Sequence, residues 1–293
     1  MVTDRIIIAS NGHNSIVLTN LPFTVEMTTG FDKLKVVNVT SQGFDQDGAS
    51  LLNSYVQPRD MEIKGQIKAD TTAQMQLLRD KLINLFIPKT DIMITHFFGG
   101  KNRVIKTRVE QTPDINFTAV SKIQEYSVTL TATEPYWRDV NETLVQIANV
   151  SGGFHFPLII PAGDGIIFGL KSASLIASVY NYSSIKVGMR IIFHASGHVE
   201  DPQLFDVNKR TFIRILCELE AGDEITIETG QDKTVTLTRQ GVQYDYMGHI
   251  DLADGGNTFL ELDPGDNLFR YSAEEGEDML ETKIYFYNKY PGV

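Results

Sequence analysis

The stretch Thr131-Ala-Thr-Glu-Pro-Tyr-Trp-Arg-Asp139 decides how the chain is organised. It ends a run over Lys122–Thr133 in which apolar and polar side chains alternate, and a period of two predicts a strand with one buried face. Pro135 follows that strand, where its missing N–H does no harm. Tyr136 and the only Trp of the chain, Trp137, come next. Large aromatic side chains beyond a strand end predict an anchor at a domain joint, formed by Pro135, Tyr136 and Trp137.

Charge supports a domain boundary shortly after this stretch. The chain has 293 residues and a net charge of −11, enough length for two domains with separate cores. Residues 1–150 carry 15 Lys/Arg and 16 Asp/Glu, whereas residues 151–293 carry 11 and 21. Ser151-Gly-Gly153 has the composition of a flexible connection. We therefore predict a first domain over 1–138, a linker over 139–153 and a second domain over 154–293.

The first domain is predicted to be mainly β with a single packed helix. Thr71 and Gln74 have the spacing of a capping box, and Pro88 ends the helix that follows. Apolar residues lie on one stripe of that helix. Residues 92–98 and 103–109 flank Gly99-Gly100 and predict a long β-hairpin.

The second domain is predicted to contain only strands. From residue 154 onward, about ten short apolar runs alternate with turn residues, and we find no helical period. This pattern is typical of a β-sandwich or a jelly roll.

Motifs for chemistry are weak throughout. His194 and His198 have an i, i+4 spacing but lack the Glu and the helix of a zinc protease. The sequence shows neither a phosphate-binding glycine loop nor a nucleophile elbow, so we expect no enzyme activity, no metal site and no cofactor. The single Cys217 cannot form an internal disulfide, and no apolar run is long enough to cross a membrane. The first ten residues are not typical of a signal peptide.

Two groups of side chains are candidate contact sites. The return arm of the hairpin carries four cations and no acid, so it is either a solvated face or a contact with an acidic surface of a neighbouring subunit. Four tyrosines of the second domain are either sheet packing or a platform for sugars. The cations are Lys101, Arg103, Lys106 and Arg108, and the tyrosines are Tyr180, Tyr182, Tyr244 and Tyr246.

Several short segments, taken in order, resemble a known family. Each is ordinary strand or turn chemistry by itself, but their order and spacing are similar to those of phage distal tail proteins (Dit). The segments are Glu134-Pro-Tyr-Trp137, Phe154-His-Phe-Pro157, Ala221-Gly-Asp-Glu-Ile-Thr-Ile-Glu-Thr229, Phe259-Leu-Glu-Leu-Asp-Pro-Gly-Asp-Asn267 and Ile284-Tyr-Phe-Tyr-Asn-Lys-Tyr-Pro-Gly-Val293.

This resemblance implies a structural role in a virion. It implies an N-terminal β-sandwich or split-barrel-like domain that forms a hexameric ring, and a C-terminal galectin-like sandwich. Such a ring sits at the distal end of a siphophage tail, assembled in the host cytoplasm, and joins the tail tube to the hub. The implied partners are other copies of the chain, the tail tube protein, the tail-associated hub protein, the tape measure protein, a receptor-binding protein, and DNA in passage. The alternative is a carbohydrate-binding adhesion module of a baseplate.

Overall fold

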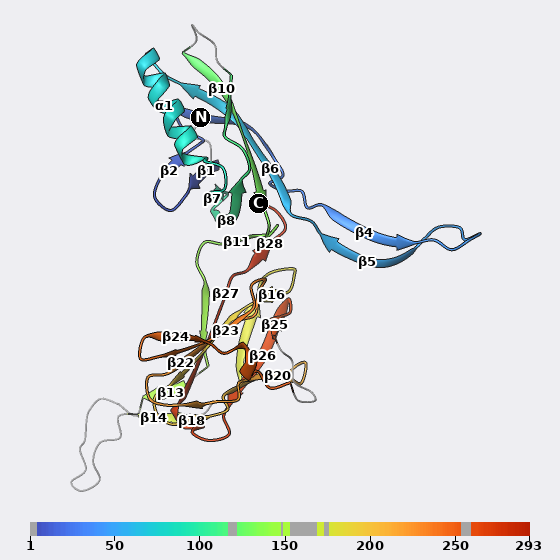
Figure 1. Ribbon diagram of the computed structural model, residues 1–293, viewed down its shortest axis with the longest axis vertical. Coiled ribbons are helices and arrows are strands. Elements are labelled where there is room, and N and C mark those ends of the chain that lie inside the picture. Colours follow the sequence, from blue (N-terminus) through green and yellow to red (C-terminus); the bar gives the residue numbers. More distant parts are fainter. Residues whose placement is uncertain (1–4, 117–121, 148, 153–168, 173–175, 253–258) are drawn as a thin grey trace, which may run out of the picture. The chain divides into compact units, whose positions relative to one another are not determined.

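The computed structural model in Figure 1 describes residues 5–116, 122–147, 149–152, 169–172, 176–252 and 259–293. The chain divides into unit 1, which comprises Met1–Val140 and Lys289–Val293, and unit 2, which comprises Asn141–Asn288. The mainly-β fold predicted from the sequence is confirmed, with one α-helix in the described part of the chain. No helix of these residues is long and apolar enough to cross a membrane.

Unit 1 is built on one large antiparallel sheet that does not close into a barrel. Its main path runs β2-β1-β7-β8-β10-β6-β3, and three short strands attach at the side. The alternation predicted before Pro135 is present in β10, whose inward residues include Tyr126 and Leu130. The strands are β1 (Arg5–Ser10), β2 (Ser15–Val17), β3 (Phe23–Thr29), β6 (Arg59–Lys68), β7 (Asp91–Phe98), β8 (Lys101–Val109), β9 (Asp114–Ile115), β10 (Ile123–Ala132), β11 (Trp137–Asp139) and β28 (Lys289–Tyr290).

Helix α1 (Thr72–Leu85) covers one face of this sheet, as its sequence predicts (Figure 1). The Thr71 hydroxyl accepts a hydrogen bond from the Gln74 N–H, and the Gln74 side chain accepts one from the Asp70 N–H. These bonds satisfy N–H groups that the first turn would otherwise leave without a partner. Met75 and Leu82 are buried in the same core as the strands.

A two-stranded arm extends from unit 1 (Figure 1). It consists of β4 (Val36–Ser41) and β5 (Ser50–Val56), which pair with each other and with no other described strand. From the sequence alone, residues 34–40 are a strand candidate and residues 41–49 have the composition of a turn, but the returning strand is not predicted.

Unit 2 is a sandwich of two antiparallel sheets. The orders are β12-β27-β17-β22-β23-β24 and β15-β26-β19-β20. Inward residues of both sheets, such as Phe193 and Phe269, belong to one hydrophobic core, which is the packing predicted for this half. The strands are β12 (Thr143–Gln146), β27 (Leu280–Phe286), β17 (Arg190–Ala195), β22 (Glu224–Glu228), β23 (Thr234–Arg239), β24 (Val242–Asp245), β15 (Ala177–Asn181), β26 (Gly265–Ser272), β19 (Gln203–Asp206) and β20 (Thr211–Arg214).

Among the described residues, unit 2 also contains three short strand pairs and two 3₁₀ turns. They are β13 (Asn149–Gly152) with β14 (Gly169–Ser172), β16 (Val187–Gly188) with β25 (Glu261–Leu262), β18 (Val199–Glu200) with β21 (Glu218–Leu219), η1 (Met247–His249) and η2 (Glu277–Met279). The predicted linker over 139–153 therefore contains strand residues. The aromatic stretch at 154–157 lies outside the described residues.

Candidate functional site

Of the three residues predicted as an aromatic anchor, Trp137 lies in the core of unit 1, whereas Pro135 and Tyr136 are half-buried. Trp137 is completely buried, and its indole N–H donates a 2.9 Å hydrogen bond to the carbonyl oxygen of Phe31. Its ring contacts the rings of Phe31 and His96. The lone Trp therefore fixes the end of β10 to the start of the arm within the same unit, and its role at a joint stays a prediction.

Arg59, the first residue of β6, is buried next to this aromatic group. Its guanidinium donates to the carbonyl oxygens of Gly30 and Phe31, at 2.7 Å each, to that of Pro135 at 2.6 Å, and to that of Pro291. Burial lowers the pKa of Arg59, although the nearby Asp32 opposes this shift. Arg59 thus joins three segments: the residues that precede the arm (30–35, here called its root), the stretch after β10 and the last residues of the chain.

Sequence reasoning missed Arg59, although a signal was present. Arg59 has the same parity in the strand as Met61 and Ile63, so the alternation that predicts their burial also places Arg59 on the inner face. A cation on an inner face is held by hydrogen bonds, since an unpaired buried charge is costly.

His96 shares the same interior. The Arg5 Nε–H donates a 2.9 Å hydrogen bond to His96 Nε2, which requires a neutral imidazole at that atom. Burial, together with the positive charges of Arg5 and Arg103, lowers the pKa of His96 to about 4. The polar groups of this core are thus arranged around an uncharged histidine.

The four cations predicted as subunit contacts have different surroundings within unit 1, and their contact role stays a prediction. The Arg103 guanidinium donates to the carbonyl oxygen of Gly292 and lies 3.9 Å from the ring centroid of Tyr290, so it holds the returning end of the chain. Lys106 and Arg108 both approach Asp91, at 3.0 and 3.7 Å. Lys101 is exposed near the turn of the hairpin.

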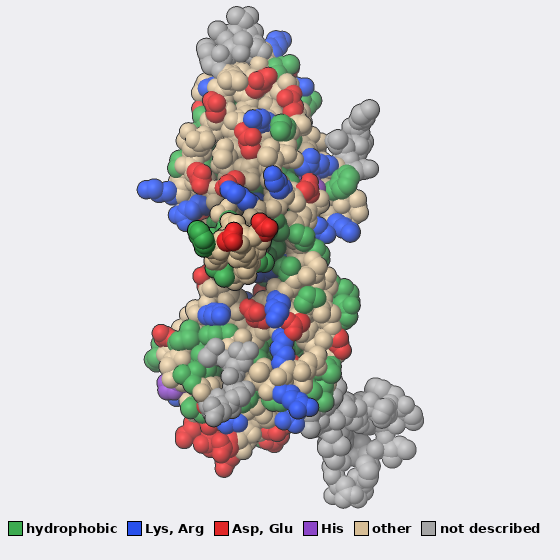
Figure 2. All heavy atoms as spheres, turned by 90° about the vertical axis from the view of Figure 1, so that its right-hand side faces the viewer, with side chains coloured by type: hydrophobic (Ala, Val, Ile, Leu, Met, Phe, Trp, Pro, Cys, Tyr) green, Lys and Arg blue, Asp and Glu red, His purple; other side chains and the backbone are tan. Residues whose placement is uncertain are grey.

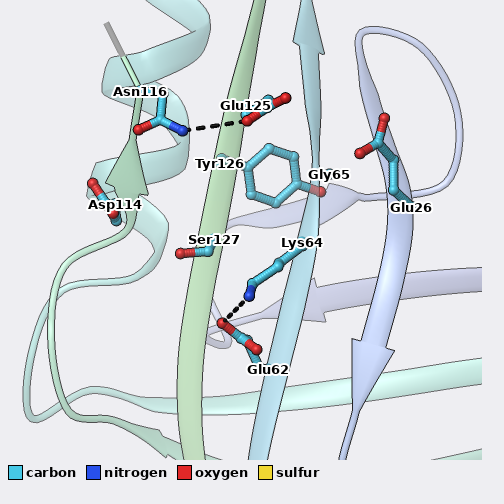
Figure 3. A pocket seen from close by; sticks show the side chains of 9 residues that line it. All are labelled: Glu26, Glu62, Lys64, Gly65, Asp114, Asn116, Glu125, Tyr126 and Ser127. Carbon is cyan, nitrogen blue, oxygen red and sulfur yellow. Dashed lines mark hydrogen bonds and ion pairs between the residues drawn. The ribbon is translucent and has the colours of Figure 1, made fainter.

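An acidic groove lies on the outer face of the large sheet (Figure 3). It has a volume of about 500 Å³ and is formed by β3, β6, β9 and β10. Four carboxylates line it, and the ammonium of Lys64 lies 3.0 Å from the carboxylate of Glu62. The carboxylates are those of Glu26, Glu62, Asp114 and Glu125. A groove of this charge suits cationic side chains and repels acidic ones.

A β-bulge shapes this groove. The pairing of β3 with β6 shifts between Val25 and Met27, so Glu26 is the extra residue, and its side chain lines the groove. Gly65 is required opposite the bulge, because a Cβ there would lie 1.7 Å from the Thr24 carbonyl oxygen. The buried Tyr126 hydroxyl donates to that same oxygen at 3.2 Å, and Figure 3 shows its ring between β10 and β6.

The arm formed by β4 and β5 exposes most of its apolar side chains. Leu52 is 66% exposed, and Phe44 at the turn has its whole side chain in solvent. In Figure 2 the arm points toward the viewer, and hydrophobic and acidic side chains lie side by side at its tip. The exposed apolar residues of the arm are Val36, Val39, Phe44, Leu51, Leu52 and Tyr55. A two-stranded ribbon is at best marginally stable alone in water, and exposed apolar patches of this kind are typical of surfaces that contact a partner.

The four tyrosines of unit 2 form two separate groups. Tyr180 and Tyr182 are exposed, and their ring centroids lie 4.6 Å apart. Tyr244 is exposed on β24, whereas Tyr246 is half-buried and stacks on His249 at 4.1 Å. The first pair has the exposure expected of a stacking platform.

The histidine pair of the sequence is not brought together as a metal site. His198 instead lies in an exposed cluster, where its ligand atom and those of Glu200 and Glu275 are within 4.8 Å of one another. His198 Nδ1 is 3.1 Å from a Glu220 oxygen, and this contact raises the pKa of His198. Figure 2 shows acidic side chains gathered at one end of unit 2.

Solved structures with the same fold come from phage tails. The distal tail protein of phage SPP1, described as a paradigm of the hub adsorption apparatus in phages that infect Gram-positive bacteria, matches with a TM-score of 0.69 and 12% identity over 97% of this chain and 99% of that one. The baseplate of phage p2 in its activated conformation with calcium matches with a TM-score of 0.54 and 11% identity over 99% of each chain. The strontium form gives the same TM-score at 12% identity. No curated protein sequence matches the chain.

Family comparison assigns both halves of the sequence. Residues 12–163 match the phage tail protein RIFT-related domain, and residues 183–290 match the C-terminal domain of the siphovirus-type tail component. Together the two matches cover most of the chain in the order expected from the sequence. The chain is a structural tail component and belongs to the family of siphophage distal tail proteins.

Proposed function

We propose that copies of this chain assemble through unit 1 into a closed ring of six at the distal end of a siphophage tail. The ring joins the tail tube to the hub that carries the adsorption apparatus. The number six is only what the resemblance to the family implies, whereas the position in the tail is supported by the related structures, which are a hub protein and a baseplate. Self-assembly rests on this chain's own surface.

The arm is the observation that carries the proposal. A ring requires a heterologous contact, in which a patch on one copy meets a different patch on the next. The arm is such a patch, since its apolar side chains are exposed and its strands pair with no other described strand. Covering those side chains releases the water that they order in the free chain.

The test compares the full chain with a variant that lacks the arm. Replacing residues 38–54 by Asn-Gly closes the strands at the Val37–Tyr55 pair with a two-residue turn. Native mass spectrometry and negative-stain images should show a hexamer for the full chain and a monomer for the variant. Circular dichroism should show that the variant is folded, since loss of the hexamer by itself lowers the unfolding midpoint. A full chain that stays monomeric at high concentration contradicts the proposal. A variant that still forms hexamers excludes the arm as its cause.

The proposed partners follow from the place of such a ring. They are the tail tube protein on one side and the tail-associated hub protein on the other, with the tape measure protein, a receptor-binding protein and DNA in passage as further contacts. We propose a scaffold rather than an enzyme, assembled in the host cytoplasm. Co-purification of the tagged full chain with each expressed tail protein tests these contacts.

The exposed tyrosine pair favours glycan binding as a second candidate function. Tyr180 and Tyr182 lie 4.6 Å apart with half or more of each side chain in solvent. A sugar ring stacks on such faces, and the residues around them supply polar groups. A glycan array of the full chain should lose its signals on Tyr182→Ala but keep them on Tyr244→Ala. An array without signals contradicts this function.

A further inference from the structure

The tip of the arm is a preformed aromatic and acidic projection. Its turn is held by its own hydrogen bonds, in which the Gly43 N–H donates to the Gln46 side chain at 2.9 Å and the Gln42 amide donates to the Gln46 carbonyl oxygen at 2.9 Å. This turn presents Phe44 entirely to solvent, with the carboxylates of Asp45 and Asp47 beside it. The tip can therefore enter a partner surface without losing much conformational freedom.

A receptor for this tip should be apolar at its centre and cationic at its rim. The acidic groove of Figure 3 fails this requirement, because four carboxylates would face the two aspartates of the tip. A second hollow, of about 190 Å³, is lined by Phe98, Lys101 and Arg103. It is small, and Arg103 is already occupied by the Gly292 carbonyl oxygen and the Tyr290 ring.

A third hollow of unit 1 meets the requirement. It has a volume of about 460 Å³, and Leu21, Pro22 and Ile123 provide its apolar wall. Lys68 and Lys122 also line it, and neither has an acidic group within 4.0 Å among the described residues. The walls are fixed by backbone hydrogen bonds from the Lys68 N–H to Pro22 and from the Ala69 N–H to Lys122. Asp70 lines the hollow as well, so its two lysines outnumber its single carboxylate.

We propose that the arm tip of one copy docks in this third hollow of a second copy. Phe44 enters the apolar wall formed by Leu21, Pro22 and Ile123, and the aspartates beside it face Lys68 and Lys122. The inference rests on the proposed self-assembly and adds the two patches that meet. Charge complementarity selects this hollow over the acidic groove and fixes the direction of the contact.

The arm is long enough for its tip to contact a neighbouring copy. Eight residue steps separate Val36 from Phe44, which at roughly 3.3 Å per extended residue spans about 26 Å. In its own copy Phe44 is fully exposed and occupies no hollow. Because the tip and the hollow are different patches, each copy can insert its tip into one neighbour and accept the tip of another. A ring needs a heterologous contact of this kind.

Cysteine cross-linking tests the contact directly. In a Cys217→Ser background of the full chain, the pair Phe44→Cys with Ile123→Cys should form a disulfide-linked ladder of oligomers on oxidation. The matched pair Phe44→Cys with Phe98→Cys should not, although Phe98 is 57% exposed and Ile123 only 43%. A ladder in the Phe98 pair alone, or no ladder in either pair while the parent chain forms oligomers, overturns the docking site and leaves the ring proposal standing. A parent chain that is monomeric at every concentration overturns both.

Charge reversal supplies a second readout by sedimentation at low salt. Phe44→Ala should weaken association by about thirtyfold or more, as expected for a central aromatic anchor. Lys68→Glu with Lys122→Glu should weaken it by about tenfold, and adding Asp45→Lys with Asp47→Lys should restore it. At concentrations where the parent is dissociated, each unfolding midpoint should match that of the parent. Association that is unaffected by the reversal, or not restored by the second pair, overturns the proposed contact.

Discussion

Unit 1 contains two long hairpins of opposite character. The hairpin of β7 and β8 lies inside the large sheet, where β7 also pairs with β1 and β8 also pairs with β10 and β11. The hairpin of β4 and β5 pairs only with itself among the described strands. The first buries Ile94 and Ile105, whereas the second exposes Leu51 and Leu52.

The difference follows from the order of side chains along each strand. In β7, apolar residues that face the core alternate with residues that face outward. In the arm, Val36 and Val37 are adjacent, as are Leu51 and Leu52, so apolar side chains point to both faces. A strand that is apolar on both faces needs a cover on each. A hairpin embedded in a sheet is therefore part of the fold, whereas one without a cover is the surface that we propose as an interface.

The largest effect should come from Arg59, which joins the root of the arm to the core. Arg59→Met removes the donors for the buried carbonyl oxygens of Gly30, Phe31 and Pro135. We expect the free energy of unfolding of unit 1 to fall by about 3–5 kcal/mol. Urea denaturation measures this change. Lys35→Met, at an exposed site of the same root, is the control and should stay within about 0.5 kcal/mol.

A matched pair of truncations compares the two hairpins directly. Ile94→Ala in β7 opens a cavity in the core and should cost about 2–4 kcal/mol. Leu52→Ala in β5 removes a side chain that is already in solvent, so the unfolding free energy of the monomer should change little. Equal losses in both variants would show that the arm folds back onto the core in solution.

Low pH should weaken the embedded hairpin through His96. The pKa of His96 is about 4 in the folded chain and about 6.5 when unfolded, so the unfolded chain binds the proton first. Stability is therefore complete well above pH 6.5 and falls by about 3 kcal/mol as pH is lowered to 4. The charges that face His96 are those of Arg5, Arg103 and Asp32.

Denaturation curves between pH 4 and 7 check this loss. His96→Gln can still accept a hydrogen bond from Arg5 but does not titrate. In this variant the unfolding free energy should therefore fall less between pH 7 and pH 4 than in the parent chain. The arm-shortened variant should keep the parent's dependence, because residues 38–54 contain no histidine. A His96→Gln chain with the parent's pH dependence would contradict the assignment.

Much of unit 1 could be predicted from the sequence because local rules decide it. The capping pair Thr71 and Gln74, the alternation in β10 and the hairpin at Gly99 depend on neighbours a few residues apart. The hydrogen bonds of Arg59 could not be predicted, since they join residues 30, 135 and 291. The neighbours of the 92–109 hairpin could not be predicted either, because its pairing with β1 and β10 depends on topology.

The candidate sites were harder to predict for the same reason. Four cations on one strand do not reveal which segments lie beside that strand. Arg103, for example, donates a hydrogen bond to the carbonyl oxygen of Gly292 at the end of the chain. The acidic groove combines the bulged Glu26 with Asp114 and Glu125, which no local pattern connects. The apolar arm could have been recognised from the sequence. The adjacent Leu51 and Leu52 do not fit the alternation of a strand with one buried face.

The smallest expected effect concerns the charged side chains of the embedded hairpin, which should contribute much less to stability than its buried residues. Lys106 and Arg108 share Asp91, and more than half of each cationic side chain is in solvent. Exposed ion pairs contribute little because water and salt screen them. Lys106→Ala and Arg108→Ala should each change the unfolding free energy by less than about 0.5 kcal/mol, and the change should vanish in 1 M salt. If either variant instead lost ring assembly at unchanged stability, the embedded hairpin would also be an interface, through its side chains rather than its strand edges.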